Sequence, residues 1–185
     1  MKRILCFFLT LLLGVSAKGA EKSAYLGKLH QDLRASSDIM DERYTRALDA
    51  YVRLMELGKP GFRVLADAWV YDRIPEGNWL QWYDDFLVRY GKGVHDDTAD
   101  AYYAYLNDRM VNDDEFALAA AKRLREVYDN RTLLEWLKAP MGQRRVAYIS
   151  LKEKYPGIPK FSFAASDKTR AAQFSAVEMF VNGRK

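Results

Sequence analysis

The sequence predicts an all-α protein, an irregular helical bundle of eight or nine helices arranged as antiparallel pairs. Three observations predict this class. Most segments place apolar residues three or four positions apart, which is the spacing of one helical face. Proline, glycine and short polar clusters separate these segments, and such short connections make neighbouring helices antiparallel. Strand-like alternation is nearly absent, and no repeat of fixed period persists, so an irregular bundle is favoured over a solenoid.

The first residues are typical of a secretory signal peptide. Lys2-Arg3 gives a positive start, residues 4–15 form a largely apolar run, and Val15-Ser16-Ala17 offers small residues for cleavage. A membrane-spanning helix needs roughly 20 residues, more than this run supplies. We therefore predict a cleaved signal over residues 1–17 and a single helical domain over residues 18–185. The predicted location is periplasmic or secreted, with no membrane span after cleavage; a retained anchor is the alternative.

Two helices are predicted before the middle of the chain. The first covers residues 21–36, and the second covers residues 39–57. Each has an apolar stripe, formed by Tyr25, Leu26, Leu29 and Leu33 in the first and by Met40, Tyr44, Ala47, Leu48, Tyr51, Val52 and Met55 in the second. Gly58-Lys59-Pro60-Gly61 follows, and such a sequence ends a helix.

The aromatic stretch over residues 62–90 is predicted to be the centre of the core. Apolar residues at helical spacing lie on both sides of Ile74-Pro75-Glu76-Gly77-Asn78, a sequence suited to a tight turn. Three of the four tryptophans lie in this stretch. We expect two antiparallel helices packed face to face, with Trp69 and Trp82 buried or nearly so.

Five more helices are predicted in the second half. Gly91-Lys92-Gly93 closes the hairpin, residues 95–98 are expected to cap the next helix, and Asn112 or Asp113 caps the one after it. Phe161-Ser162-Phe163 is expected to be extended, packing across helix ends or adding one strand. The helices are predicted over residues 97–111, 113–128, 131–139, 140–155 and 167–181, with Ala101, Tyr102, Leu106 and Met110 facing inward in the first of them.

The composition excludes several classes of function. The chain has 29 Lys and Arg against 25 Asp and Glu, and Lys2 and Arg3 belong to the predicted signal. The mature chain is therefore close to neutral, and nucleic acid is not expected as a partner, because binding it needs a concentrated basic surface. Cys6 is the only cysteine. A mature chain without cysteine has no disulfide, no thiol nucleophile and no cysteine metal site.

Charge is unevenly distributed along the chain. Residues 72–115 contain eleven acidic and four basic residues, a net charge of −7. Residues 138–185 contain ten basic and three acidic residues, a net charge of +7. Segregated charge suits a protein with charged partners. The alternative is that the two regions face each other or the solvent.

The acidic middle supplies the predicted partner-binding site. Its residues are Glu76, Asp84, Asp85, Asp96, Asp97 and Asp100. A catalytic interpretation is also open. Glu76 lies between aromatic helices that would raise its pKa by desolvation, as a general acid requires, with Asp84 or Asp85 as the second carboxylate of a glycosidase. Ordinary turn chemistry and surface charge also account for these acids.

No metal site and no cofactor are predicted. His95, Asp96, Asp97 and Asp100 could attract a divalent cation, but a closed site needs three or four well-placed ligands and His30 is distant in sequence. Acidic residues at a helix N-terminus explain the cluster without a metal. The sequence contains no nucleophile elbow and no glycine-rich phosphate loop.

One segment resembles a known family. Trp136, Ala139, Pro140, Gly142 and Gln143 follow a pattern of aromatic, small, proline, any residue, glycine and glutamine. Over about residues 131–156, including the later Tyr155-Pro156, this is similar to a family of small exported bacterial helical proteins of unknown function. The resemblance implies export and a helical fold, and no activity. Physically, proline suits a first helical turn and glycine allows close helix approach, so we interpret the segment as a packing motif.

The sequence therefore favours an exported, non-enzymatic protein that binds another protein. The partner is expected to carry a basic contact surface, and an inhibitor or an immunity protein against a cell-envelope toxin fits this description. The alternative is a peptidoglycan hydrolase that uses Glu76 with Asp84 or Asp85.

Overall fold

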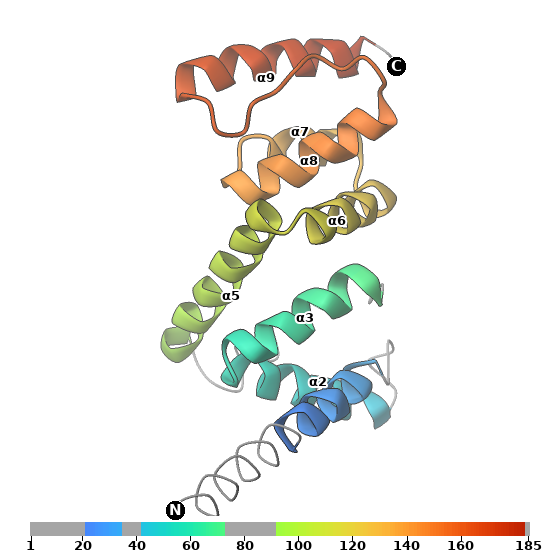
Figure 1. Cartoon of the computed structure of the whole chain (residues 1–185), viewed down its shortest axis with the longest axis vertical. Helices are drawn as coiled ribbons and strands as arrows, with labels where there is room; N and C mark the ends of the chain where they lie inside the picture. Colours follow the sequence, from blue (N-terminus) through green and yellow to red (C-terminus); the bar gives the residue numbers. More distant parts are fainter. Residues whose placement is uncertain (1–20, 35–41, 73–91, 184–185) are drawn as a thin grey trace, which may run out of the picture. The chain divides into compact units, whose positions relative to one another are not determined.

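A computed structural model describes residues 21–34, 42–72 and 92–183, with only the backbone described for residues 42, 43 and 92–96 (Figure 1). These ranges are helical with short connections and contain no strand, so the predicted all-α class is confirmed. The predicted signal peptide and the second helix of the aromatic hairpin lie outside them. The helices are residues 21–33, α2 (Glu42–Glu56), α3 (Lys59–Tyr71), α5 (Lys92–Asn112), α6 (Asp114–Val127), α7 (Asn130–Trp136), α8 (Met141–Lys154) and α9 (Asp167–Asn182).

The chain divides into two compact units, residues 1–98 and 99–185. The division falls within α5, after its first two turns. A single domain over residues 18–185 stays a prediction.

The first unit is built on the hairpin of α2 and α3. Gly58 adopts a φ of 64°, a left-handed conformation that glycine tolerates best, and its carbonyl accepts the Phe62 N–H at 2.8 Å. Pro60 occupies the first turn of α3, where its missing N–H costs nothing. The buried apolar residues are Leu29, Leu33, Tyr44, Ala47, Leu48, Ala50, Tyr51, Val52, Leu54, Met55, Phe62, Leu65, Ala66, Ala68 and Val70. The predicted stripe of α2 is confirmed over its described side chains.

Gly61 allows α2 and α3 to come very close. A Cβ atom placed on Gly61 would lie 1.8 Å from the Leu54 carbonyl oxygen and 2.9 Å from the Leu54 Cα. Both atoms belong to the backbone of α2, so no side-chain rotation can make room. The hairpin therefore depends on a residue without a side chain at this position.

Trp69, expected to be buried or nearly so, is half-buried and lies on the same face of α3 as the buried Phe62 and Leu65. An indole is so large that it is rarely covered completely, even on a core-facing stripe. Tyr71, also placed on the apolar face by the sequence, is 48% exposed. Trp82 lies outside the described residues.

In the second unit, α8 packs against both α6 and α7. The contact with α6 includes one buried polar group. The Ser150 hydroxyl is fully buried and bonds the Ala121 carbonyl of α6 at 2.7 Å and the Val146 carbonyl at 2.9 Å. The buried apolar residues of this unit are Ala99, Tyr102, Met110, Phe116, Ala117, Ala120, Ala121, Leu124, Leu133, Leu134, Leu137, Val146, Ala147, Leu151, Ile158, Phe161, Val177 and Val181.

The segment between α8 and α9 packs on helices and forms no strand. The Phe161 ring is buried and lies 5.8 Å from the Tyr148 ring of α8, centroid to centroid. The Tyr148 hydroxyl donates to the Pro159 carbonyl at 3.1 Å. Of the two arrangements expected for Phe161-Ser162-Phe163, packing across helices is the one observed.

Two helix boundaries differ from the sequence prediction. α5 begins at Lys92 rather than near Asp97, so the expected cap at residues 95–98 lies inside the helix. Glycine is unfavourable inside a helix, and Gly91-Lys92-Gly93 was therefore expected to precede α5. This preference is weak, and contacts elsewhere in the fold override it. α7 ends at Trp136, and the three following residues form turns before α8. Asp113 is the N-cap of α6, as predicted, and accepts the Phe116 N–H at 3.0 Å.

Gly27 and Gly61, which lie in different helices of the first unit, should respond in opposite directions to alanine. Gly61→Ala forces a clash with the α2 backbone, and such overpacking typically costs about 1–3 kcal/mol of unfolding free energy. Gly27→Ala is the matched control, because a Cβ there meets nothing within 4 Å. It should stabilise by about 0.5–1 kcal/mol through helix propensity. Urea denaturation measures both changes, and an unchanged midpoint for Gly61→Ala would contradict the close approach.

Candidate functional site

The structure describes part of the site predicted from the sequence. Asp97 and Asp100 lie on α5, and both side chains are exposed. Asp96 lies on α5 without a described side chain. The other three residues, Glu76, Asp84 and Asp85, lie outside the described residues, so the hydrolase hypothesis that uses them stays a prediction.

Within the second unit, α5 has one exposed face. We define the α5 face as Asp100, Ala101, Tyr103, Ala104 and Asp108, which are all exposed. At 3.6 residues per turn, Asp100, Ala101, Ala104 and Asp108 lie on the side of the helix away from the buried Ala99 and Tyr102. Tyr103 lies at the edge of this face, next to the positions of Ala99 and Met110. The expected inward position of Ala101 is therefore wrong, and Ala99 takes that place. The α5 face carries two carboxylates, and the large aromatic side chain at its edge is one turn away from Asp100.

Tyr103 is the residue of this face that sequence reasoning missed. Its side chain is 55% exposed, whereas that of Tyr102 is 8% exposed. The two rings are inclined at 43° with centroids 6.0 Å apart, so Tyr102 supports one side of the exposed ring. Tyr103 follows the buried Ala99 by four residues, about one helical turn, so residue spacing alone places it near the buried side and did not indicate its exposure.

The other acids at the end of α5 are used within the unit. Asp113 caps α6 and accepts from the Arg109 Nε at 3.3 Å, and Asp114 pairs with Arg145 of α8. Arg145 also donates to the carbonyls of Met110 and Val111, at 3.1 and 2.7 Å, and so satisfies backbone acceptors at the end of α5. These acids belong to the corner between α5 and α6. By contrast, the Asp100 side chain is exposed, and the exposed Asp108 carboxylate accepts from the Asn112 Nδ2 of the same helix at 2.8 Å.

The carboxyl of Asp113 has a lowered pKa. The largest cause is the hydrogen bond from the Phe116 backbone N–H, and Arg109 adds a hydrogen bond and a favourable charge. The Arg109 guanidinium also lies 4.1 Å from the centroid of the buried Phe116 ring. Local capping therefore stabilises the charged form of Asp113 and gives it a structural role.

The proline-glycine motif makes a helix contact. Pro140 is the N-cap of α8 and provides no side-chain acceptor. The Gly142 N–H instead donates to the Asn107 Oδ1 of α5 at 2.7 Å, so α5 supplies the missing cap. A Cβ on Gly142 would lie 2.4 Å from the Asn107 carbonyl oxygen. The interpretation of Gly142 as a residue of close helix packing is confirmed, while the family resemblance stays a prediction.

Arg144 fixes the segment that leads to α9. Its Nε donates to the Ala139 carbonyl, and its Nη1 donates to the Phe163 carbonyl at 3.0 Å. Burial lowers the pKa of Arg144, and the charge of Arg170 lowers it further. Next to it, Lys138 lies 4.6 Å from the Phe174 ring of α9. These basic residues hold the last helix in place within the unit.

The described residues contain no group of three or more side chains placed to hold a metal ion. His30 contacts Asp72 at the end of α3, and Arg34 lies 3.6 Å from the same carboxylate. His95 has no described side chain. The acids at positions 96 and 97 were expected to lie at a helix N-terminus. This expectation is wrong, because α5 begins at Lys92 and its first turn contains no acid.

In the described ranges, none of the helices has the length and hydrophobicity needed to cross a membrane. Comparison of the chain with protein families, with curated proteins and with solved structures found no match.

Removing the cap that α5 provides for α8 should destabilise the second unit. Asn107→Ala leaves the Gly142 N–H without its acceptor, and loss of a helix N-cap costs about 1 kcal/mol. Asn107→Asp is the matched control, because it keeps the acceptor and adds a charge favoured at a helix N-terminus. Denaturant midpoints should fall for Asn107→Ala and hold for Asn107→Asp. Equal losses for both variants would contradict the capping role.

Asp113 should make stability depend on pH. Because its folded pKa is lowered, its contribution is complete above the unfolded pKa, near 3.9 for Asp, and is lost as pH falls through the folded pKa. Asp113→Asn keeps a capping acceptor without a charge. This variant should lose less stability than wild type between about pH 5 and pH 2. Denaturation at a series of pH values measures the difference, and parallel curves would contradict this assignment.

Proposed function

We propose that this protein is an exported, non-enzymatic protein that binds another protein through the α5 face. The observation that carries the proposal is the composition of that face. It combines the exposed carboxylates of Asp100 and Asp108 with Tyr103, 55% exposed, at the edge of the same face. The proposed partner carries a basic contact surface.

The parts of the α5 face have different roles in binding. Tyrosine is enriched among residues that dominate binding energy, because it has a large amphipathic surface and few rotatable bonds. Exposed carboxylates attract a basic partner over a distance and mainly raise the rate of association. Ala101 and Ala104 have short side chains, which let a partner approach the helix between the two acids. This arrangement supports a binding face in which Tyr103 is the anchor and the nearby carboxylates attract the partner.

Export rests on the signal peptide predicted over residues 1–17. A helical binding protein in the periplasm fits the role of an inhibitor, or of an immunity protein against a toxin that acts in the cell envelope. In that role, the α5 face would occupy a basic surface of the toxin.

The test is capture of a partner from periplasmic extract with the tagged mature chain, followed by binding kinetics with that partner. Tyr103→Ala should weaken binding at least tenfold, mainly through faster dissociation, as expected for an aromatic anchor. Asp100→Lys combined with Asp108→Lys should slow association and remove its dependence on salt. Glu56→Lys is the charge control, since Glu56 is exposed on α2 and not part of the α5 face.

Two outcomes would contradict the proposal. One is that no partner is captured across several growth conditions and salt concentrations. The other is that a captured partner binds the Tyr103→Ala and Asp100→Lys/Asp108→Lys variants as tightly as it binds wild type.

A further inference from the structure

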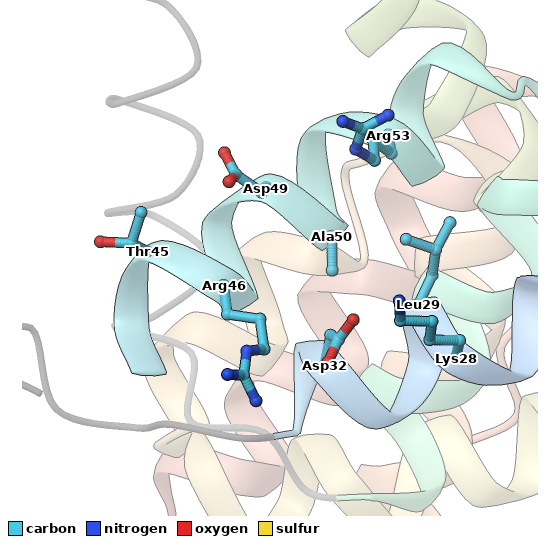
Figure 2. Close-up of a pocket in the computed structure, with 8 residues that line it drawn as sticks. All are labelled: Lys28, Leu29, Asp32, Thr45, Arg46, Asp49, Ala50 and Arg53. Carbon is cyan, nitrogen blue, oxygen red and sulfur yellow. The ribbon is translucent and has the colours of Figure 1, made fainter. Parts of the chain in front are cut away.

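The first unit contains an open pocket of about 580 Å³ between the helix over residues 21–33 and α2. Figure 2 shows that both helices supply its lining side chains. Three cations and two carboxylates line it: Lys28 and Asp32 from the first helix, and Arg46, Asp49 and Arg53 from α2. The lining therefore has a net charge of +1, with both signs present.

Helical spacing places these charges around one space. Lys28 and Asp32 are four residues apart, which is one turn of the same face. Arg46, Asp49 and Arg53 are spaced by three and four residues, so they form a stripe over two turns of α2. Leu29 and Ala50, 4% and 2% exposed, provide an apolar floor between the stripes. A polar ligand with a short apolar body matches this distribution.

The mixture of charges excludes simpler ligands. A small cation is repelled by Lys28, Arg46 and Arg53. A simple polyanion meets three favourable cations but also faces Asp32, and a like charge at short distance is unfavourable. A ligand with one ammonium group and two carboxylates can pair with Asp32, Arg46 and Arg53.

We infer that the pocket binds a small acidic zwitterion, an amino acid or short peptide with one ammonium group and two carboxylates. Arginine forms planar, bidentate hydrogen bonds with carboxylates, so Arg46 and Arg53 hold the two acidic groups. The Asp32 carboxylate accepts from the ligand ammonium. Pockets that bind small molecules have volumes of about 300–1,000 Å³, so the observed space suits a dipeptide. This inference is independent of the α5 face and of the proposed partner.

The test is an NMR titration of the ¹⁵N-labelled protein with the dipeptide glutamyl-alanine, which has one ammonium and two carboxylate groups. Saturable shifts of the backbone amides of Leu29, Asp32, Arg46 and Ala50 are expected. N-acetyl-glutamyl-alanine removes the ammonium charge, and alanyl-alanine removes one carboxylate. Each should bind about tenfold more weakly, as loss of one charge-assisted hydrogen bond predicts.

Protein variants provide a second readout. Arg46→Gln and Asp32→Asn should each weaken glutamyl-alanine about tenfold. The Asp32→Asn variant should no longer distinguish the acetylated dipeptide from the unmodified one. Arg131→Gln and Glu56→Gln are matched controls, because both residues are exposed and neither lines the pocket.

The comparison between ligands uses wild-type protein and does not depend on how the variants fold. Absence of shifts at the pocket with 20-fold excess over a millimolar protein sample would overturn the inference. Equal binding of the acetylated dipeptide would show a simple anion site and would overturn it as well.

Discussion

Each compact unit depends on one helix contact that only glycine permits. Gly61 brings α3 onto the Leu54 backbone of α2, and Gly142 brings the start of α8 onto Asn107 of α5. The chain has a single cysteine, so no internal disulfide can compensate for a lost contact. At the second contact, close approach also brings Asn107 within hydrogen-bonding distance of the Gly142 N–H. The same glycine therefore determines both the packing and the capping of α8.

The local features of the fold were predictable from the sequence. The apolar stripe of α2, the Asp113 cap and the role of Gly142 follow from residue spacing and from the chemistry of single residues. Other features depend on contacts between distant residues. Arg145 meets Asp114 across 31 positions, and no local pattern specifies that pair. The pocket likewise joins side chains from two helices. The sequence of each helix shows which of its residues share a face, but it does not show which faces of the two helices meet. The exposure of Tyr103 could not be predicted from residue spacing, because the helical wheel places this residue close to the buried Ala99 and Met110.

The segregation of charge along the sequence has a partly internal explanation. Asp114 belongs to the acidic region, and its partner Arg145 belongs to the basic region. Arg144, also basic, donates to backbone carbonyls that hold the segment before α9. Some of the opposite charges thus bind each other or the backbone within the second unit. The acids that stay exposed on α5 form a smaller acidic surface near Tyr103. The proposed contact therefore involves fewer residues than the net charge of residues 72–115 suggested.

The bonds made by Arg145 order the end of the helix that carries the proposed binding face. Its guanidinium is 16% exposed and joins the last carbonyls of α5 to Asp114 of α6. The end of α5 is therefore ordered by folding, before any partner arrives. A partner that bound a fraying helix would have to supply the conformational entropy lost on ordering it. A helix already fixed at this end lowers that cost for the proposed partner.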